Sequence, residues 1–221
     1  MTTSKTAAPI AKREPLTAVR IVTAGIELAD ADGASSLTMR RLADHLGFKV
    51  MALYNHVANK DELLALMVDA VVGSIELPAE DEPAMAAIRA YTIAIRDAFV
   101  RHPWSPGLWQ RYLPGPHGID HMEQLLATFA RSGLPADIAH HGFHAVINHV
   151  LGYTLQEEAM EFAKDEATAE ETMKAFIASV STGSHPHTIA HVHQHLDGDT
   201  SSSFALVLDL ILDGLTRLAG D

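Results

Sequence analysis

The chain has 221 residues, of which 48% are hydrophobic and 20% are charged. This length and composition allow one small domain of about 60 residues and a larger one of about 150, each with a packed core. The absence of cysteine excludes disulfides and thiolate metal sites, and no apolar run approaches the ~20 residues that a membrane-spanning helix needs.

The first 15 residues contain no apolar signal segment. They carry Lys5, Lys12 and Arg13, and we interpret residues 1–15 as a flexible basic arm. From these observations we expect a cytoplasmic protein that does not associate with a membrane.

A first helix is predicted from Leu16 to Ala31, because apolar residues recur along one stripe at helical spacing. The Asp32-Gly33 pair that follows is a helix stop signal. A second, shorter helix is predicted over residues 37–46. Thr38 stands at its start as an N-cap, and Gly47 at its end supplies a left-handed turn at low cost.

A third helix is predicted over residues 49–56, with Val50, Leu53 and Val57 turned toward the core. The side chains that remain accessible are Lys49, Met51, Ala52, Tyr54, Asn55 and His56. An outward methionine, alanine and tyrosine are unusual on a solvated face. They fit a DNA major groove, where methyl groups pack on thymine methyls and polar side chains reach phosphate oxygens. Residues 16–60 are therefore predicted to be a three-helix, helix-turn-helix DNA-binding domain.

A fourth helix is predicted to begin near Lys60. Asn59 and Glu62 have the spacing of a capping box, with asparagine in place of serine or threonine. An apolar stripe continues through Met67 and Val71, and we assign residues 61–77 to a linking helix.

The charge is distributed unevenly between the two predicted domains. Residues 1–60 hold eight basic and five acidic residues, a balance of +3, whereas residues 61–221 hold 8 basic and 23 acidic residues, a balance of −15. Phosphate is attracted to the first part and repelled by the second. We therefore expect the amino-terminal domain to face DNA, with a binding affinity that falls as salt rises.

The segment LADHLGFKVMALYNHVANKDELL resembles the DNA-binding domain of the tetracycline repressor (TetR) family, including its LYxHVxNK pattern. The resemblance covers about residues 16–72. It implies that a threonine near phosphate and an arginine contact the duplex, that the first turn of the recognition helix reads bases, and that later residues hold phosphates. With the residues from the pattern above, the predicted DNA-binding set is Thr38, Arg40, Lys49, Val50, Met51, Ala52, Tyr54, Asn55, His56 and Lys60. Val50 and Met51 depart from the tetracycline repressor, so its operator sequence does not carry over.

A boundary follows at residues 77–83, which are rich in proline and acidic residues. Beyond it every long segment has helical rather than alternating periodicity. The predicted helices are residues 83–102, 105–111, 117–132, 135–162, 166–181 and 203–219. The expected fold is all-α, with residues 78–221 as a helical ligand-binding and dimerisation domain.

The last predicted helix is apolar over most of its circumference and needs cover on more than one side. Together with the 135–162 helix, it could form a four-helix interface in a homodimer, and the alternative is a fully internal core. The closing LDLILDGL resembles the dimerising helix of the tetracycline-repressor branch. The predicted interface residues are Phe143, Val146, Ile147, Val150, Phe204, Val207, Leu208, Ile211 and Leu215. A dimer would read a pseudo-palindromic operator in double-stranded DNA.

The resemblance also implies a pocket for a small-molecule inducer among the carboxy-terminal helices, whose occupation releases the operator. Aromatic and sulfur side chains with a few polar groups suit a partly apolar molecule. The candidate lining residues are Phe99, His102, Trp104, Leu108, Trp109, Tyr112, Met122, His144 and Asn148. The function predicted in this way is a homodimeric transcriptional regulator, in the first place a repressor.

Two alternatives remain open. Histidines at i, i+4 spacing, such as His140 with His144 and His187 with His191, could share a metal ion in a metal-responsive regulator. A helical ligand-binding or enzymatic protein with a degenerate helix-turn-helix is the other alternative, although no nucleophile, phosphate-binding loop or metal triad is recognisable. We assign no catalytic residue, no metal ligand and no cofactor.

Overall fold

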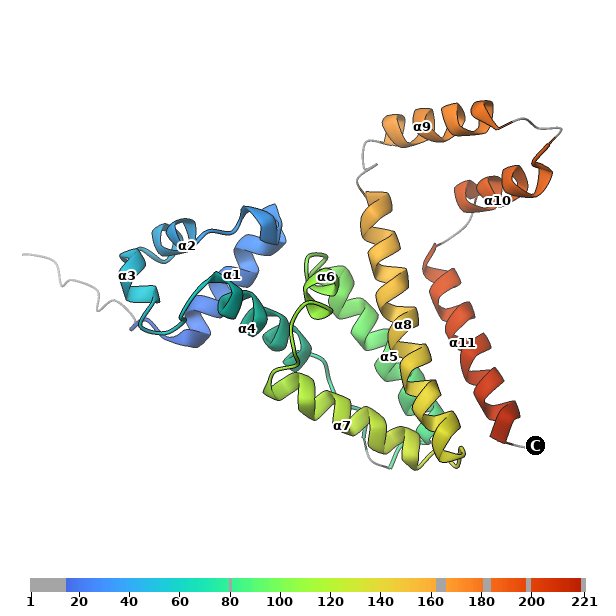
Figure 1. The fold of residues 1–221 in the computed structure, drawn as a ribbon, viewed down its shortest axis with the longest axis horizontal. Helices are drawn as coiled ribbons and strands as arrows, with labels where there is room; N and C mark the ends of the chain where they lie inside the picture. The colour runs from blue at the N-terminus through green and yellow to red at the C-terminus, as the bar shows by residue number, and fades with distance from the viewer. Residues whose placement is uncertain (1–14, 80, 162–165, 181–183, 198–199, 220–221) are drawn as a thin grey trace, which may run out of the picture. The chain divides into compact units, whose positions relative to one another are not determined.

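The computed structural model describes residues 15–79, 81–161, 166–180, 184–197 and 200–219. These residues form helices and connecting turns without any strand, which confirms the all-α prediction (Figure 1). The chain divides into two compact units, Met1–Leu63 and Leu64–Asp221, which we call unit 1 and unit 2. No helix in the described ranges is long and apolar enough to cross a membrane.

Unit 1 is built from short helices around a small apolar core. Its elements are α1 (Ala18–Asp32), a 3₁₀ turn (Ala34–Ser36), α2 (Met39–Leu46), α3 (Val50–Leu53) and the start of α4 (Lys60–Gly73). Helix α2 packs on α1 and on α3. The fully buried side chains at the centre are Ile21, Leu37, Leu42, Leu53 and Leu63.

Helix α3 is shorter than predicted. The sequence pattern indicated a helix over residues 49–56, but the α-helical turn ends at Leu53. The N–H groups of His56 and Val57 both donate to the Leu53 carbonyl, at 2.9 and 3.0 Å, and Val57 is buried. A helix of this length has too few internal hydrogen bonds to be stable alone, so tertiary packing determines where it ends.

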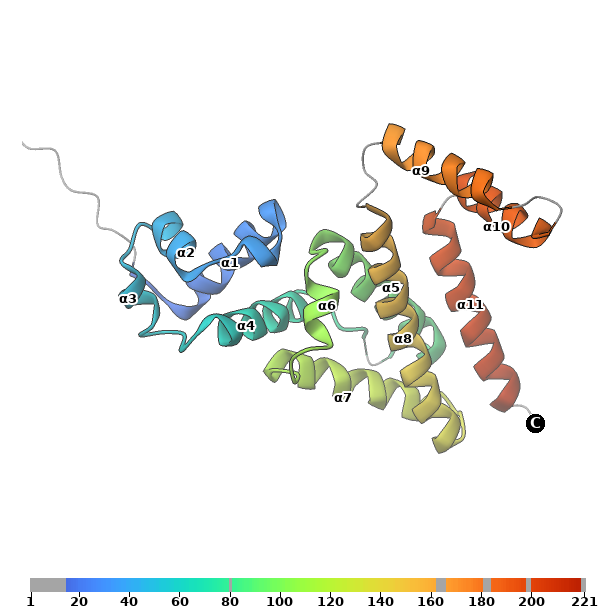
Figure 2. The same cartoon turned by 45° about the horizontal axis from the view of Figure 1, so that its top comes forward.

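Unit 2 contains the remainder of α4 and a helical bundle. Its elements are α5 (Ala84–Arg101), α6 (Ser105–Trp109), α7 (Pro116–Ala130), α8 (Ala136–Glu161), α9 (Glu166–Ser179), α10 (Pro186–Asp197) and α11 (Thr200–Ala219). Helix α8 is central, because it packs on α5, α6, α7 and α11 (Figures 1 and 2). Its buried Val146 and Val150 contribute to the same apolar core as Ile88, Phe129 and Leu208.

A bidentate ion pair joins α5 to α11. The Arg89 guanidinium donates to the two carboxylate oxygens of Asp209 at 2.6 and 3.2 Å. The hydrogen bond from Arg89 lowers the pKa of Asp209. Both side chains are more than a third exposed, so water screens the pair and its contribution to stability is small.

The segment that contains His187 and His191 forms a helix, α10, that the sequence analysis did not predict. Helix α10 begins at Pro186. Proline is tolerated at the first helical position because an N–H there would have no partner within the helix. Ile189 and Val192 are three residues apart and are the less exposed members of the segment, whereas His187, His191 and His193 are exposed. Two apolar residues are too weak a stripe to predict a helix.

Candidate DNA interface and ligand pocket

The turn between α2 and α3 has the geometry that the sequence predicted. The Thr38 hydroxyl accepts a hydrogen bond from the Arg41 N–H at 3.1 Å, which caps α2. Gly47 has φ 70° and ψ 33°, a left-handed conformation that favours glycine, and its N–H closes the end of α2. The predicted helix-turn-helix is therefore present, with a second helix that is shorter than predicted.

The predicted DNA-binding residues all lie on the accessible surface of unit 1. Met51 is 73% exposed and Tyr54 is 42% exposed, although both are large apolar side chains. Five further residues of the set are exposed: Thr38, Arg40, Lys49, Asn55 and His56. Val50, Ala52 and Lys60 are half-buried. Leu53 and Val57 are buried within the unit, so α3 turns its apolar side inward and the predicted contact side outward.

The two adjacent arginines of α2 have different roles. Arg41 forms an ion pair with Asp32, and its guanidinium also donates to the Ser36 hydroxyl at 2.9 Å. It ties α2 to the end of α1. Arg40 is exposed and forms no ion pair with any described residue. Arg40 is therefore the α2 arginine that can reach a DNA base or phosphate.

The start of α4 is fixed by the predicted cap. The Asn59 side-chain oxygen accepts from the Glu62 N–H at 2.8 Å. The Glu62 carboxylate in return accepts from the N–H of Ala58, one residue before the position of a standard capping box. This double cap sets the position of Lys60 at the first turn.

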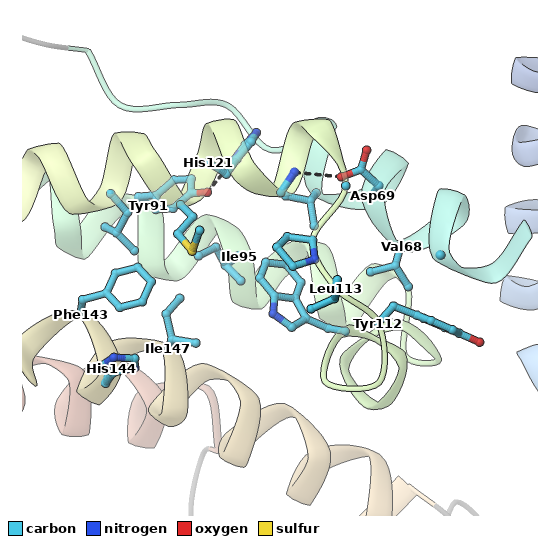
Figure 3. Close-up of a pocket in the computed structure, with 18 residues that line it drawn as sticks. Val68, Asp69, Tyr91, Ile95, Tyr112, Leu113, His121, Phe143, His144 and Ile147 are labelled. Atoms are coloured by element: carbon cyan, nitrogen blue, oxygen red, sulfur yellow. Dashed lines mark hydrogen bonds between the residues drawn. The ribbon is translucent and has the colours of Figure 1, made fainter. Parts of the chain in front are cut away.

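Unit 2 contains a cavity of about 290 Å³. Its wall comes from α4, α5, α7 and α8, from the end of α6 and from the segment that joins α6 to α7 (Figure 3). Apolar and aromatic side chains dominate the wall. The lining residues are Ala65, Val68, Asp69, Val72, Tyr91, Ile95, Trp109, Tyr112, Leu113, Pro114, Gly115, Gly118, His121, Met122, Leu125, Phe143, His144 and Ile147.

The structure brings four of the nine predicted ligand-binding residues to this cavity: Trp109, Tyr112, Met122 and His144. Five do not line it: Phe99, His102, Trp104, Leu108 and Asn148. Phe99 is a core residue that meets the Trp109 ring edge-on at 5.2 Å between centroids, and Trp104 is buried beside His102. Ligand contact by these five residues stays a prediction, and the cavity lining does not include them.

Asp69 of α4 caps the amino terminus of α7. One carboxylate oxygen accepts from the Gly118 N–H at 2.9 Å, and the other accepts from His117, from the backbone N–H at 3.3 Å and from the ring Nδ1 at 3.0 Å. Asp69 is only 8% exposed. The carboxylate thus satisfies amides at the positive end of a helix, and it connects two walls of the cavity.

Tyr91 of α5 and His121 of α7 form a buried polar pair at another side of the cavity. The Tyr91 hydroxyl lies 2.5 Å from His121 Nδ1, and the rings stack at 5.7 Å between centroids (Figure 3). Burial raises the pKa of Tyr91. Burial, followed by the charge of His117, lowers the pKa of His121 below the usual 6.5. The lowered pKa favours the neutral imidazole, and the tautomer of this ring decides which of the two groups donates the hydrogen bond.

Two family models match the chain. Residues 21–67 match the model described as bacterial regulatory proteins of the tetR family, and residues 77–219 match the tetracyclin repressor-like C-terminal domain. The chain belongs to the TetR family. Together the two matches span both structural units, so the resemblance seen in the helix-turn-helix extends to the cavity-bearing part.

Curated relatives of this TetR-family chain are named as transcriptional regulators. An HTH-type transcriptional regulator of Saccharopolyspora erythraea is 39% identical over 155 residues, which are 69% of this chain and 65% of the relative. The HTH-type transcriptional repressor DrrR1 of Streptomyces coeruleorubidus is 32% identical over 212 residues, which are 92% of this chain and 78% of the relative. The chain thus spans just under two thirds of the first relative's length.

Solved structures of the family have the same fold. The TetR family protein ActR of Streptomyces coelicolor, in complex with actinorhodin, superimposes with a TM-score of 0.80 at 28% identity and covers 94% of this chain and 100% of that chain. Apo ActR superimposes with a TM-score of 0.76.

The sequence analysis missed the contribution of α4 and the polar pair. Val68, Asp69 and Val72 continue the apolar and acidic pattern of an ordinary amphipathic helix. Tyr91 has the spacing of a core residue relative to Ile88 and Ile95. The one available signal was the Pro114-Gly115-Pro116 break, because two prolines around a glycine mark a place where another group approaches the backbone closely.

The residues predicted for the dimer interface of this TetR-family chain differ in their burial within the single chain. Five of the predicted residues are buried inside unit 2: Val146, Val150, Phe204, Leu208 and Leu215. Phe143, Ile147 and Ile211 are half-buried, and Val207 is exposed. The apolar residues that α11 leaves exposed are Leu206, Val207, Leu210 and Leu218. A helix apolar on nearly all sides has an inner and an outer face, and the sequence pattern does not distinguish them.

The histidines of α8 do not support the metal-responsive alternative. The rings of His140 and His144 meet edge-on at 4.7 Å between centroids. In the described parts of the chain, no group of three or more histidine, aspartate and glutamate side chains is arranged to hold a metal ion.

Proposed function

We propose that this TetR-family protein is a transcriptional repressor that acts as a homodimer in the bacterial cytoplasm. It binds a pseudo-palindromic operator through α2 and α3, and a small molecule in the cavity of unit 2 releases it. The observation that carries this function is the accessible surface of the helix-turn-helix, where Met51 and Tyr54 are exposed, as are Arg40, Lys49 and His56.

A protein that reads DNA bases directly needs exposed side chains that can enter the major groove. Met51 and Ala52 present methyl groups for thymine, and Arg40 presents a fork of donors for guanine or phosphate. Tyr54, His56 and Lys60 are suited to phosphate oxygens, which fix the register of the protein on the duplex. Two copies related by a twofold axis would contact half-sites about one helical turn apart.

Release by a ligand needs only a difference in affinity between two states. A ligand that prefers one arrangement of the dimer, and DNA that prefers another, weaken each other's binding by the same factor. Helix α4 is the element through which we propose the coupling, because it contains Lys60 as well as the cavity residues Val68 and Asp69. We assign the cavity to ligand binding rather than to catalysis.

The test is binding to the DNA that flanks the protein's own gene, measured by footprinting and fluorescence anisotropy. Arg40→Ala and Tyr54→Ala should each weaken specific binding, by about 1–3 kcal/mol for a base contact and less for a phosphate contact. The wild-type affinity should fall steeply as salt is raised.

The matched control is Arg101→Ala, which removes an exposed arginine from α5 in unit 2. This control should bind DNA like the wild type. If Arg40→Ala and Tyr54→Ala leave the protection unchanged, the proposed roles of these residues are wrong. If wild-type protein has no salt-sensitive affinity for the DNA, the proposed function itself is wrong.

A further inference from the structure

The described part of the cavity wall contains one side chain with a formal charge, and that charge is negative. Among the described residues that line it, Asp69 is the one with a formal charge at neutral pH, and no lysine or arginine contributes to the wall. The two histidines there include His121, whose pKa is lowered by burial. A buried anion without a cationic partner is costly. No lysine or arginine in the described part of the wall would compensate a carboxylate on a ligand; the Arg111 guanidinium, which is outside the lining, lies over the Tyr112 ring at 5.5 Å from its centroid.

The rest of unit 2 adds to this preference. Residues 64–221 carry 21 acidic and 8 basic side chains. Their summed field attracts cations and repels anions before a ligand reaches the cavity. Hydrogen bonds from His117 and Gly118 hold the Asp69 carboxylate in place.

The shape of the cavity favours rings. Trp109 is the last residue of α6. Tyr112 follows α6, while Phe143 and His144 come from α8 and Tyr91 from α5 (Figure 3). Aromatic walls bind flat π-systems through stacked or edge-on contacts. A cavity of about 290 Å³ lies at the small end of drug-binding pockets. The Tyr91 hydroxyl and His121 Nδ1 already form a hydrogen bond with each other, and the hydroxyl oxygen retains capacity for one more hydrogen bond with a ligand.

We infer that the cavity binds an uncharged or positively charged aromatic molecule and discriminates against aromatic anions. This inference rests on the proposed function and names the ligand class of its pocket. It follows from the juxtaposition of one buried carboxylate with aromatic walls that lack a cationic side chain.

Three probes with the same tricyclic frame test the inference: proflavine as the cation, acridone as the uncharged form and acridone-4-carboxylate as the anion. The chain has two tryptophans, and Trp104 does not line the cavity. Trp104→Phe in the full-length chain therefore leaves Trp109 as a single fluorescence reporter in the wall. Titration calorimetry on the wild type provides a second readout.

We expect proflavine and acridone to quench Trp109 saturably, and the anion to bind weaker than proflavine by about tenfold or more. Asp69→Asn should reduce the ratio of cation to anion affinity. The matched control Glu123→Gln removes an exposed carboxylate from α7 and should leave the ratio unchanged.

Equal or tighter binding of the anion in the wild type overturns the inference, even if Asp69→Asn proves unstable. Quenching by none of the three probes at their solubility limits also overturns it. The DNA titration described above is run on the same protein samples. Loss of DNA binding there would contradict the proposed function and leave the charge preference of the cavity standing, so the two failures are distinguishable.

Discussion

His121 shows how burial at a single residue connects structure to pH. Its imidazole is held neutral between α5 and α7, because burial lowers its pKa in the folded protein below the usual 6.5. A group whose pKa is depressed by folding contributes stability above its unfolded pKa and loses it as the pH falls, since the unfolded chain then binds the proton more readily.

We therefore predict that the free energy of unfolding of the wild type falls as the pH drops below about 6.5. The reason is that His121 binds up to about one more proton in the unfolded chain than in the folded protein. His121→Asn keeps an acceptor for the Tyr91 hydroxyl and removes the titration, so its stability should depend less on pH in this range. Urea denaturation at a series of pH values measures the difference. His187→Asn, an exposed substitution on α10, should keep the wild-type pH dependence. Equal slopes for His121→Asn and the wild type would show that His121 is not held neutral.

The residues that could be predicted from the sequence are those determined by local geometry. Thr38, Gly47 and Asn59 were predicted because a cap or a left-handed turn requires a few neighbouring residues only. Asp69 and Tyr91 were missed for the opposite reason. Their partners are 48 and 30 residues away along the chain, and no local pattern indicates such a pairing.

At the level of elements, the joint between α4 and α7 depends on close approach at a glycine. A Cβ added to Gly115 would come within 2.5 Å of the Asp69 carboxyl carbon. The backbone of Gly115 has φ −78°, which any residue can adopt, so the constraint is steric. Asp69 would have to rotate away and lose its hydrogen bonds to His117 and Gly118.

We predict that Gly115→Ala lowers the free energy of unfolding by about 1–2 kcal/mol, comparable with loss of a helix cap or modest overpacking. Urea denaturation measures this change. Gly107→Ala is the matched control, because its added Cβ would meet only Leu155 Cδ2, at 4.0 Å, in ordinary contact. If both variants have the same stability, the Asp69 cap does not hold α4 against α7.

The arrangement of the helices also explains why only four of the nine predicted ligand-binding residues line the cavity. Most helices of unit 2 could be located from their apolar spacing, but the cavity forms only where five helices, α4 to α8, meet. Phe99 and Trp104 are aromatic, as many pocket residues are, but both are buried in the core. Composition predicts that a side chain is covered, and only packing decides whether a neighbour or an empty space covers it.

At the level of the whole molecule, an unpartnered apolar face remains on α11. Leu206 is 61% exposed and Leu210 is 60% exposed, one helical turn apart. Exposed leucines on one stripe of a long helix are typical of an interface. We place the subunit contact of the proposed homodimer there, beside the exposed Val207.

The double substitution Leu206→Glu with Leu210→Glu should convert the dimer into a monomer, because it buries two charges without partners in the interface. Light scattering with size-exclusion chromatography measures the mass. Val100→Glu, at an exposed position of α5, should leave the dimer intact. A double variant that stays dimeric would place the interface on another face, and a monomeric wild type would contradict the homodimer.

The position of the unit boundary has a consequence for protein engineering. It falls between Leu63 and Leu64, inside α4, and Ala65 and Val68 of the cavity wall follow directly. A chimaera spliced at that boundary would have to preserve helical phase, because each residue inserted or deleted rotates the following side chains by about 100°. Joining a DNA-binding unit from another protein at Ala58, before α4 begins, would leave the helical phase of α4 intact.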